Sequence, residues 1–411
     1  MDAFLPVLLA QPLIYTNPSV PFAYDAMTTR LPNLLNDMAD QNSKPHAHNT
    51  LPPDAIGALR ALAASVAANG AIPPLSDPSS DPTWHEDWKK HGEGRTWHNA
   101  AWFFAEAYLF RVVLDVTGFA VHGIDPYHCQ KMAELNDPTP WRLLESAAAL
   151  HHTTDDTTAE ESLGVLLKLS LWGNKADGAY KQVKDSIRGT HATLDIDDAY
   201  LLADDSAAVI QHLAAHPTKP VHFINDNCGT EILLDLALAD HLLTHNWTPL
   251  ILLHTKAAPT YISDATPQDV LETIQLMGLP TRSSHVRALA ARLQAHVDNH
   301  RLIPQSHAVW NQYRFYFELP DDVRATLATA GLVISKGDAN YRRFLGDRLW
   351  PATTPLSTAA PFFPTSFVAL RTMKSDPVVG IAREVEAKLN VEDPLWRING
   401  KRGVIQAVLR E

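Results

Sequence analysis

Short apolar runs alternate with amphipathic segments in the C-terminal half, and this feature most restricts how the chain can fold. From about Tyr200 onward, "KPVHFIND" precedes "GTEILLDLALADHLLTH", and "TPLILLH" precedes "TPQDVLETIQLMG". Further on, "DDVRATLATAG" leads into "LVISKGD", and "TSFVALRTMK" follows. Such alternation indicates a mostly parallel sheet with helices on both faces, and the runs are apolar throughout, as doubly covered strands should be. We therefore predict an α/β fold, with a Rossmann-like three-layer α/β/α domain over residues 200–411.

The N-terminal part has a different pattern. "WHNAAWFFAEAYLFRVVLDVTGF" and "EESLGVLLKLSLWGNKADG" carry apolar residues at helical spacing, and loops rich in Pro, Ser and Asp separate the helical segments. We predict an N-terminal helical domain over residues 1–199, packed as a bundle layer on the α/β domain. "DIDDAYLLADDS" from Asp195 is interpreted as the acidic link between the two. The sequence does not give the strand order.

Composition excludes several classes of protein. The formal net charge of −12 argues against nucleic acid or an anionic membrane surface as the main partner. No apolar stretch approaches the roughly 18 residues that a membrane span needs. Cys129 and Cys228 are the two cysteines, so we expect no disulfide framework and a cytoplasmic location. The oligomeric state is not constrained by the sequence.

Polar residues follow each of the four apolar runs. Acid and amide side chains follow two of them: Asn225, Asp226 and Asn227 after the first, and Asp264, reached through His254 and Lys256, after the second. The other two are followed by Lys336, Asp338, Asn340, Tyr341 and Arg342, and by Arg371, Thr372, Met373 and Lys374. Ligands of open α/β sheets bind at the carboxyl ends of the strands. Oxygen ligands suit Mg²⁺ or Mn²⁺, and Arg and Lys suit phosphate.

Each of these positions has an ordinary structural interpretation as well. Asp226 and Asn227 could cap the following helix, Asp264 could belong to a turn, and Lys336-Gly-Asp could form a tight turn. The prediction of a site therefore depends on all four strand ends meeting at one edge of the sheet. Other catalytic templates are absent: the sequence has no G-x-x-x-x-G-K-[ST], no G-x-G-x-x-G, no G-x-S-x-G and no H-E-x-x-H.

These motifs resemble the damage-control phosphatase family (domain of unknown function 89), in its sugar-phosphate subfamily. The resemblance is carried by "FINDNCGTEILLDLALADHLL", "HTKAAPTYISD", "KGDANYRRFLGDRLW" and "LRTMK", and in the N-terminal half by "FAYDAMTTRLPNLL", "RTWHNAAWFFAEAYLFRVV" and "LWGNKADG". It extends from about Phe22 to about Ile381, and the R-T-x-K signature marks the subfamily. Ala101 and Cys228 depart from the family pattern without removing a ligand.

The resemblance implies a metal-dependent phosphatase that acts on small phosphate esters, such as fructose 1-phosphate, fructose 6-phosphate and related hexose phosphates. It implies a divalent metal (Mn, Mg, Co or Ni) held by Asp226, Asn227 and Asp264, the trio that the strand ends also select. Phosphate would be held by Lys374, and substrate would contact Asp338, Ala339, Asn340, Tyr341 and Arg342. Glu106, Asn174 and Asp177 are candidates for the sugar hydroxyls. For Glu106, an ion pair with Arg111 or another arginine is the structural alternative.

The predicted chemistry is hydrolysis of a phosphate monoester. Asp226, Asp264 and Lys374 are the predicted catalytic residues, with Arg342 or Lys336 helping Lys374 to offset phosphoryl charge. The attacking group is a water molecule with Asp226 or Asp264 as base, or Asp226 itself; we favour water. Two alternatives remain open. One is a protein carboxyl methyltransferase that uses S-adenosylmethionine, because the family also carries the name acidic-residue methyltransferase. The other is a binder of sugar phosphates without turnover.

Overall fold

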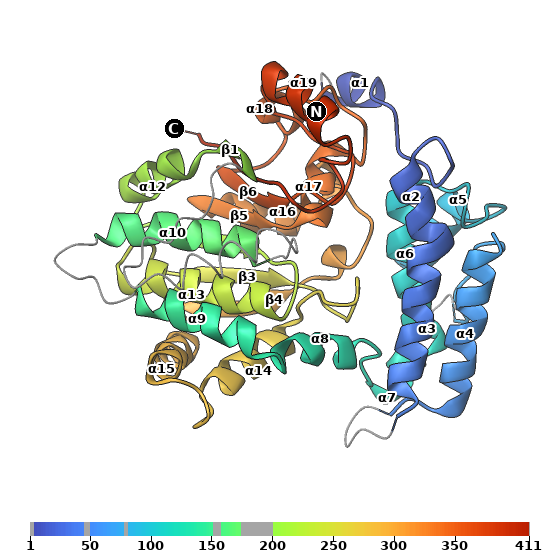
Figure 1. The fold of residues 1–411 in the computed structure, drawn as a ribbon, viewed down its shortest axis with the longest axis horizontal. Coiled ribbons are helices and arrows are strands. Elements are labelled where there is room, and N and C mark those ends of the chain that lie inside the picture. Colours follow the sequence, from blue (N-terminus) through green and yellow to red (C-terminus); the bar gives the residue numbers. More distant parts are fainter. Residues whose placement is uncertain (1–3, 45–49, 78–80, 151–157, 174–199, 411) are drawn as a thin grey trace.

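A seven-stranded sheet lies at the centre of the chain's C-terminal half (Figure 1). The computed structural model describes residues 4–44, 50–77, 81–150, 158–173 and 200–410. The strands are β1 (Leu201–Asp204), β2 (Val221–Ile224), β3 (Ile251–Thr255), β4 (Leu302–Ser306), β5 (Leu332–Lys336), β6 (Phe367–Thr372) and β7 (Gly403–Val408). Their order in the sheet is β1-β7-β6-β5-β2-β3-β4. All neighbouring strands are parallel except β6 and β7.

The predicted α/β fold is confirmed, and four of the strands are the four predicted apolar runs: β2, β3, β5 and β6. Strands β1, β4 and β7 were not predicted. The interpretation of "DIDDAYLLADDS" as a link is wrong for its second half, because Leu201–Asp204 forms β1 and pairs with β7. Strand β1 is short, lies at the sheet edge and ends in an exposed residue, so it lacks the apolar signature of the central strands.

Helices cover both faces of the sheet because successive strand side chains point to opposite sides. Phe223 packs into a core with one set of helices, and its neighbour Ile224 packs into a separate core on the other face. The first set is α9 (Pro138–Ala149), α10 (Ala159–Trp172), α12 (Ser206–Ala215), α13 (Thr230–Thr244), α14 (Pro267–Met277) and α15 (Ser284–Asp298). The second set is α1 (Phe4–Leu9), η3 (Ala308–Trp310), η4 (Tyr316–Glu318), α16 (Asp321–Ala328), α17 (Asp338–Leu345), α18 (Leu356–Ala359) and α19 (Arg383–Glu392).

A helical bundle with its own apolar core stands beside the sheet (Figure 1). It contains α2 (Pro21–Asp25), the π-helix η1 (Ala26–Arg30), α3 (Leu31–Asn42), α4 (Pro53–Ala67), α5 (Pro82–His91), α6 (Trp102–Val116) and α7 (Phe119–His122). Helix α8 (His128–Leu135) leads from the bundle to α9. Its buried Lys131 forms ion pairs with Asp125 at 2.9 Å and with Asp269 of α14 at 2.8 Å, which ties the two parts together.

The predicted division at residue 199 lies outside the described residues and stays a prediction. Within the predicted N-terminal domain, α9 and α10 share the apolar core of the sheet rather than that of the bundle. In α10, for example, Leu166 and Leu167 are buried in that shared core. The helical pattern in the sequence identifies such segments as amphipathic, but it does not say which partner their apolar faces cover.

Candidate active site

A cavity of about 200 Å³ lies where the carboxyl ends of β2, β3, β5 and β6 meet the bundle. Its lining residues come from all of these elements: Phe22, Arg30, Glu106, Asp226, Asn227, Tyr261, Asp264, Asp338, Ala339, Arg342 and Lys374. The four strand ends therefore meet at one cavity, as the site prediction requires. Eight residues of the predicted site line this cavity. Seven of them belong to the sheet domain, and one, Glu106, belongs to the bundle helix α6.

The loops after β2 and β3 are joined backbone to backbone. Asn227 and Asp264 form an antiparallel bridge, the amide of Ala265 donates to the carbonyl of Asp226 at 2.8 Å, and the amide of Cys228 donates to the carbonyl of Ser263 at 2.6 Å. These contacts hold Asp226, Asn227 and Asp264 together at one wall of the cavity. Both carboxylates are nearly completely buried.

The side chain of Asn227 has a fixed orientation. Its amide nitrogen donates to Asp226 Oδ2 at 2.8 Å and to Glu231 Oε2 at 2.8 Å. Its amide oxygen accepts a hydrogen bond from Ser263 Oγ at 2.5 Å. An amide oxygen has two lone pairs, so Asn227 keeps one acceptor position beside the two carboxylates.

Burial is the main influence on the protonation of the acid pair. Burial raises the pKa of Asp226 to about 7, the negative charge of Asp264 adds to this rise, and Lys256 and Lys374 only partly oppose it. Burial also raises the pKa of Asp264, although Lys256 Nζ lies 3.0 Å from Asp264 Oδ2. Two carboxylates and an amide oxygen are hard donors, so the residues fit a divalent cation, whose charge would oppose this rise in pKa.

A metal site of this kind depends on an amide ligand. Across the described parts of the chain, no group of three or more His, Cys, Asp or Glu side chains is arranged to hold a metal ion. The third donor here would be the Asn227 side chain. Gly337, at the start of α17, leaves the room that this wall needs: its φ is +84°, and a Cβ there would lie 1.9 Å from Asp226 Oδ2.

The opposite wall carries cationic groups. Arg342 donates to Glu106 Oε2 at 2.6 Å and to Asp347 Oδ1 at 2.8 Å. Among the described residues, its Nη2 has no hydrogen-bond partner although the atom is buried. Lys374, just after β6, lines the same cavity. A buried guanidinium nitrogen without an acceptor favours an anionic group from outside the chain, such as a phosphate.

The R-T-x-K segment divides into a structural part and a part that faces the cavity. Arg371 is completely buried and donates to Asp338 Oδ1 at 2.7 Å, to the Ser375 carbonyl at 2.9 Å and to the Pro377 carbonyl at 2.5 Å. Asp338 also accepts from the backbone amide of Lys374 at 3.2 Å. Arg371 and Asp338 therefore fix the strand end from which Lys374 reaches the cavity.

Several predicted residues lie elsewhere. Asn340 donates to the carbonyls of Lys336 at 2.9 Å and Asn225 at 3.3 Å, and the Tyr341 hydroxyl donates to Gln406 Oε1 at 2.8 Å. Neither lines the cavity; both hold the sheet end together. Asn174 and Asp177 lie outside the described residues, so their predicted contacts with sugar hydroxyls stay predictions.

Lys336 does not line the cavity either. It is completely buried, with Nζ 2.8 Å from Asp235 and 3.4 Å from Glu231, and it donates to Ser170 Oγ at 2.7 Å. The suggestion that Lys336 helps to hold phosphate does not fit this position. Glu106 is ion-paired, as its structural alternative supposed, but with Arg342 rather than Arg111, so it stays at the cavity wall.

Three lining residues were missed by the sequence analysis: Phe22, Arg30 and Tyr261. The guanidinium of Arg30 lies 4.7 Å from the centre of the Phe22 ring. Arg30 ends the π-helix η1, a kind of helix that is rare and concentrated at functional sites. Tyr261 and Ile262 have φ values of +46° and +71°, and such strain also clusters at functional sites. Neither signal can be read from residue types alone.

The chain is similar to known proteins of one family. The family model described as the damage-control phosphatase ARMT1-like domain matches residues 26–389. The chain belongs to this family. The resemblance predicted from the motifs is therefore confirmed, and family membership supports an enzyme that acts as a phosphatase.

Two named relatives agree with this assignment. The damage-control phosphatase ARMT1 of Danio rerio is 27% identical over 423 residues, covering 94% of this chain and 94% of that protein. The Xenopus laevis protein of the same name is 27% identical over 429 residues, covering 94% and 96%. A crystal structure of a DUF89 family protein from Pyrococcus horikoshii has a TM-score of 0.47 at 13% identity, over 92% of this chain and 96% of that one. Separately, none of the helices in the described residues is long and apolar enough to cross a membrane.

Proposed function

We propose that this protein is a metal-dependent phosphatase of small phosphate esters, with hexose phosphates such as fructose 1-phosphate and fructose 6-phosphate as its substrate class. The observation that carries the proposal is the pairing of two walls in one small cavity. Buried Asp226, Asn227 and Asp264 form one wall, and Arg342 and Lys374 line the same space. The first wall fits a hard cation, and the second fits a phosphoryl group.

In this proposal Asp226, Asn227 and Asp264 hold the divalent ion, for which Mn, Mg, Co and Ni are the candidates. When bound, such an ion supplies Lewis-acid stabilisation of charge on a phosphoryl oxygen. Arg342 and Lys374 bind the remaining phosphoryl oxygens and offset their charge in the transition state. Glu106 keeps Arg342 oriented through the contact at 2.6 Å, and its half-buried carboxylate is available to a substrate hydroxyl.

The attacking group is proposed to be a water molecule, with Asp226 or Asp264 accepting its proton. Direct attack by Asp226 is the alternative. Asp338 takes no part in either route, because its carboxylate is already bound to Arg371 and to the amide of Lys374. We propose that it positions Lys374. With two cysteines that form no disulfide, we also propose that the protein works in the cytoplasm.

Phosphate release from a panel of sugar phosphates tests the proposal. The assay is run with each of the four metals and with chelator, on the wild-type protein, on Asp226→Asn and on Asp54→Asn, an exposed acid outside the cavity. We expect release that needs metal, is lost in Asp226→Asn and is retained in Asp54→Asn. Release that survives both chelator and Asp226→Asn would contradict the proposed site. Methyl transfer to a protein carboxylate in the presence of chelator would favour the methyltransferase alternative instead.

A further inference from the structure

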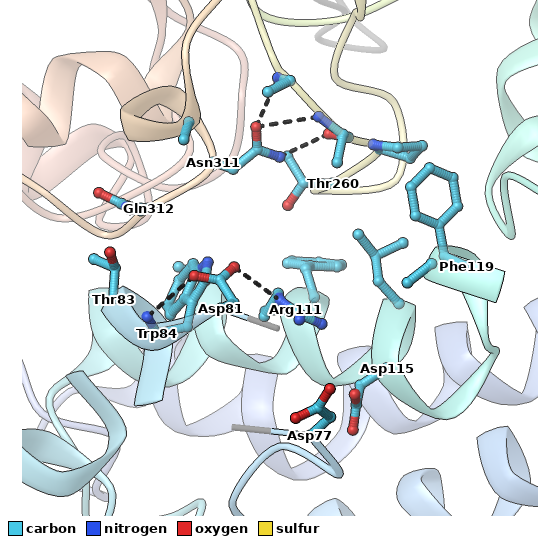
Figure 2. Close-up of a pocket in the computed structure, with 18 of the residues that line it drawn as sticks. Asp77, Asp81, Thr83, Trp84, Arg111, Asp115, Phe119, Thr260, Asn311 and Gln312 are labelled. Carbon is cyan, nitrogen blue, oxygen red and sulfur yellow. Dashed lines mark hydrogen bonds and ion pairs between the residues drawn. The ribbon is translucent and has the colours of Figure 1, made fainter. Parts of the chain in front are cut away.

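A second, larger cavity of about 450 Å³ lies between the bundle and the sheet domain (Figure 2). The bundle contributes residues from α5, α6 and α7, and the sheet domain contributes residues 257–260 and 308–312. The proposed phosphatase chemistry does not use this space. Its volume is within the range of about 300–1,000 Å³ that is typical of small-molecule sites.

The two cavities are neighbours with a shared wall. Phe110 lines the larger cavity and Tyr261 lines the smaller one, and their ring centroids lie 4.9 Å apart. The segment Lys256–Asp264 forms part of both cavities: residues 257–260 face the larger one, whereas Tyr261 and Asp264 face the smaller one. Whatever fills the larger cavity therefore contacts the segment that carries Asp264.

Negative charge dominates the wall of the larger cavity. Three aspartates and one arginine line it: Asp77, Asp81, Asp115 and Arg111. Asp81 lies 3.5 Å from Arg111 Nε, and Asp115 accepts from the amide and hydroxyl of Ser76 at 2.8 and 2.9 Å. The lining thus contains two more carboxylates than guanidinium groups, so the cavity attracts a cation.

Apart from a few uncharged polar side chains, the rest of the lining is aromatic or aliphatic. Trp84, Phe110 and Phe119 offer ring faces and edges, and most of the other residues are alanine, leucine, valine or proline. Aromatic rings beside carboxylates suit an ammonium group attached to an apolar body. Across the described residues, no group of three or more His, Cys, Asp or Glu side chains is arranged to hold a metal ion, so these aspartates suit an organic cation better than a metal ion.

One polar side chain on the opposite wall has no hydrogen-bond partner among the described residues. Thr260 is 4% exposed, and no hydrogen bond from any described residue reaches its hydroxyl. Figure 2 shows this hydroxyl pointing into the cavity, across from Asp81 and Arg111 on the bundle side. This hydroxyl can therefore donate to or accept from a ligand that enters the cavity.

We propose that the larger cavity binds a small organic cation, a protonated amine on an aromatic or branched aliphatic body, and that its occupancy alters the smaller site through the segment Lys256–Asp264. The Lys256–Asp264 ion pair joins the two ends of this segment, and its backbone is strained at Tyr261 and Ile262. A ligand that displaces residues 257–260 would therefore also move Asp264, one of the two buried acids. The binding half of the inference is independent of the proposed function, whereas the effect on turnover rests on it.

Isothermal titration of the full-length protein tests the binding half. The probes are 2-phenylethylamine, which is protonated at pH 7, and the neutral 2-phenylethanol of nearly the same shape. We expect the amine to bind at least roughly tenfold more tightly, the preference expected for a charge in a partly desolvated aromatic site. Equal affinity for the two probes, or no binding of the amine, would overturn the proposal.

Matched variants locate the site. Asp115→Asn and Asp81→Asn should each weaken amine binding several-fold, and Asn still caps helix α5 at position 81. Ala257→Trp, at an exposed position on the cavity rim, should abolish binding by filling the space. Asp54→Asn carries the same change of charge outside the cavity and should bind like the wild-type protein. Unchanged affinity in Asp115→Asn, Asp81→Asn and Ala257→Trp together would place the amine elsewhere and overturn the proposal.

The coupling half is measured in two ways. Saturating amine should change kcat for phosphate release at least twofold at constant KM, and it should change the affinity for Mn²⁺ in a titration that needs no turnover. A rise in KM alone would make the larger cavity part of the substrate site and overturn the coupling. Unchanged kcat and unchanged Mn²⁺ affinity with the amine bound would do so as well. If no ester is hydrolysed while amine binding persists, the proposed function fails and the binding half stands.

Discussion

The aspartates that follow β2 and β5 have different electrostatic surroundings. The two strands are parallel neighbours, and each is followed by an acid that lines the same cavity, Asp226 and Asp338. Burial and Asp264 raise the pKa of Asp226 to about 7. Burial also acts to raise the pKa of Asp338, but the charges of Arg371 and Arg342 outweigh it and the pKa falls below its usual value.

This difference distinguishes an acid with a proposed catalytic role, Asp226, from an acid with a structural role, Asp338. Asp338 receives its positive charge from a buried guanidinium of the same chain, so it is complete without a ligand. Asp226 shares its surroundings with a second carboxylate, and the nearby lysines do not outweigh burial and this second charge, so its pKa rises. An acid with an unfavourable, raised pKa in a cavity is the kind of group that functional sites contain. Substitutions at the two strand ends should therefore have opposite effects on activity and stability.

The largest effect is expected for Asp226→Asn. The substitution keeps the shape of the side chain but removes one of two buried like charges, so we expect kcat to fall roughly a thousandfold while thermal stability without added metal stays equal or rises. Phosphate release and the Tm measure the two effects. A clear loss of stability together with normal kcat would reverse the assignment of roles to the two strand ends.

Gly337→Ala tests whether the end of β5 shapes the end of β2. A Cβ at this position would lie 1.9 Å from Asp226 Oδ2 and would displace the carboxylate, which we expect to lower kcat roughly a hundredfold. Gly94→Ala is the matched control, because Gly94 has a φ of +69° and nothing within 4 Å. Both variants carry the backbone cost of about 1–2 kcal/mol. If the two variants had equal activity, the close approach to Asp226 would have no catalytic consequence.

Asp338→Asn should affect stability first. It leaves the completely buried Arg371 without its carboxylate, so we expect a loss of about 3 kcal/mol in the free energy of unfolding at pH 7. The pKa of Asp338 is lowered in the folded state from its ordinary value of 3.8. Its contribution is therefore present above pH 4 and is lost as the pH falls through the folded pKa. Urea unfolding between pH 7 and pH 3 measures the difference between variant and wild type, which should shrink in acid. A constant difference would exclude the ion pair as its cause.

Arg30→Gln should have the smallest effect. Arg30 is exposed and contacts the ring of Phe22, and we place it at the mouth of the cavity as a contact for the substrate's anionic group. An exposed charge contributes up to about 1 kcal/mol, so KM should rise by up to roughly fivefold with kcat and Tm unchanged. Steady-state kinetics on the preferred sugar phosphate measure this. A changed kcat would show that the bundle takes part in the chemical step.

The sequence predicts the sheet wall of the site far better than the bundle wall. Asp226 and Asp264 follow central apolar strands, so the rule for strand ends places them together. Arg30 lies about two hundred residues earlier in the chain than Asp226, and no local pattern connects it to the sheet. Strand β4 was missed for a related reason: it is an edge strand with Pro304 inside it, and proline is confined to such edges.

Position at a strand end does not decide which way a side chain points. Lys336 ends β5 and Lys374 follows β6, the neighbouring strand, and the sequence analysis considered both for the phosphoryl group, Lys374 as its main contact and Lys336 as a possible helper. Lys336 is buried against Asp235 and Glu231 of α13, whereas Lys374 lines the cavity. The distinction depends on the register of β5 and on the acids of α13, which are residues that a reading of strand ends does not compare.

Strand β7 gives the sheet a particular order of assembly. It is inserted between β6 and β1 and is the partner of β1 in the sheet. During synthesis, about two hundred further residues must therefore be added after β1 before its backbone groups have a strand to pair with. Such a large separation in sequence between paired strands slows folding. The bundle has its own core and can form much earlier. A ribosome-bound chain that ends before residue 403 should carry a folded bundle and an unpaired β1, with β6 exposed along one edge as a target for chaperones or for aggregation.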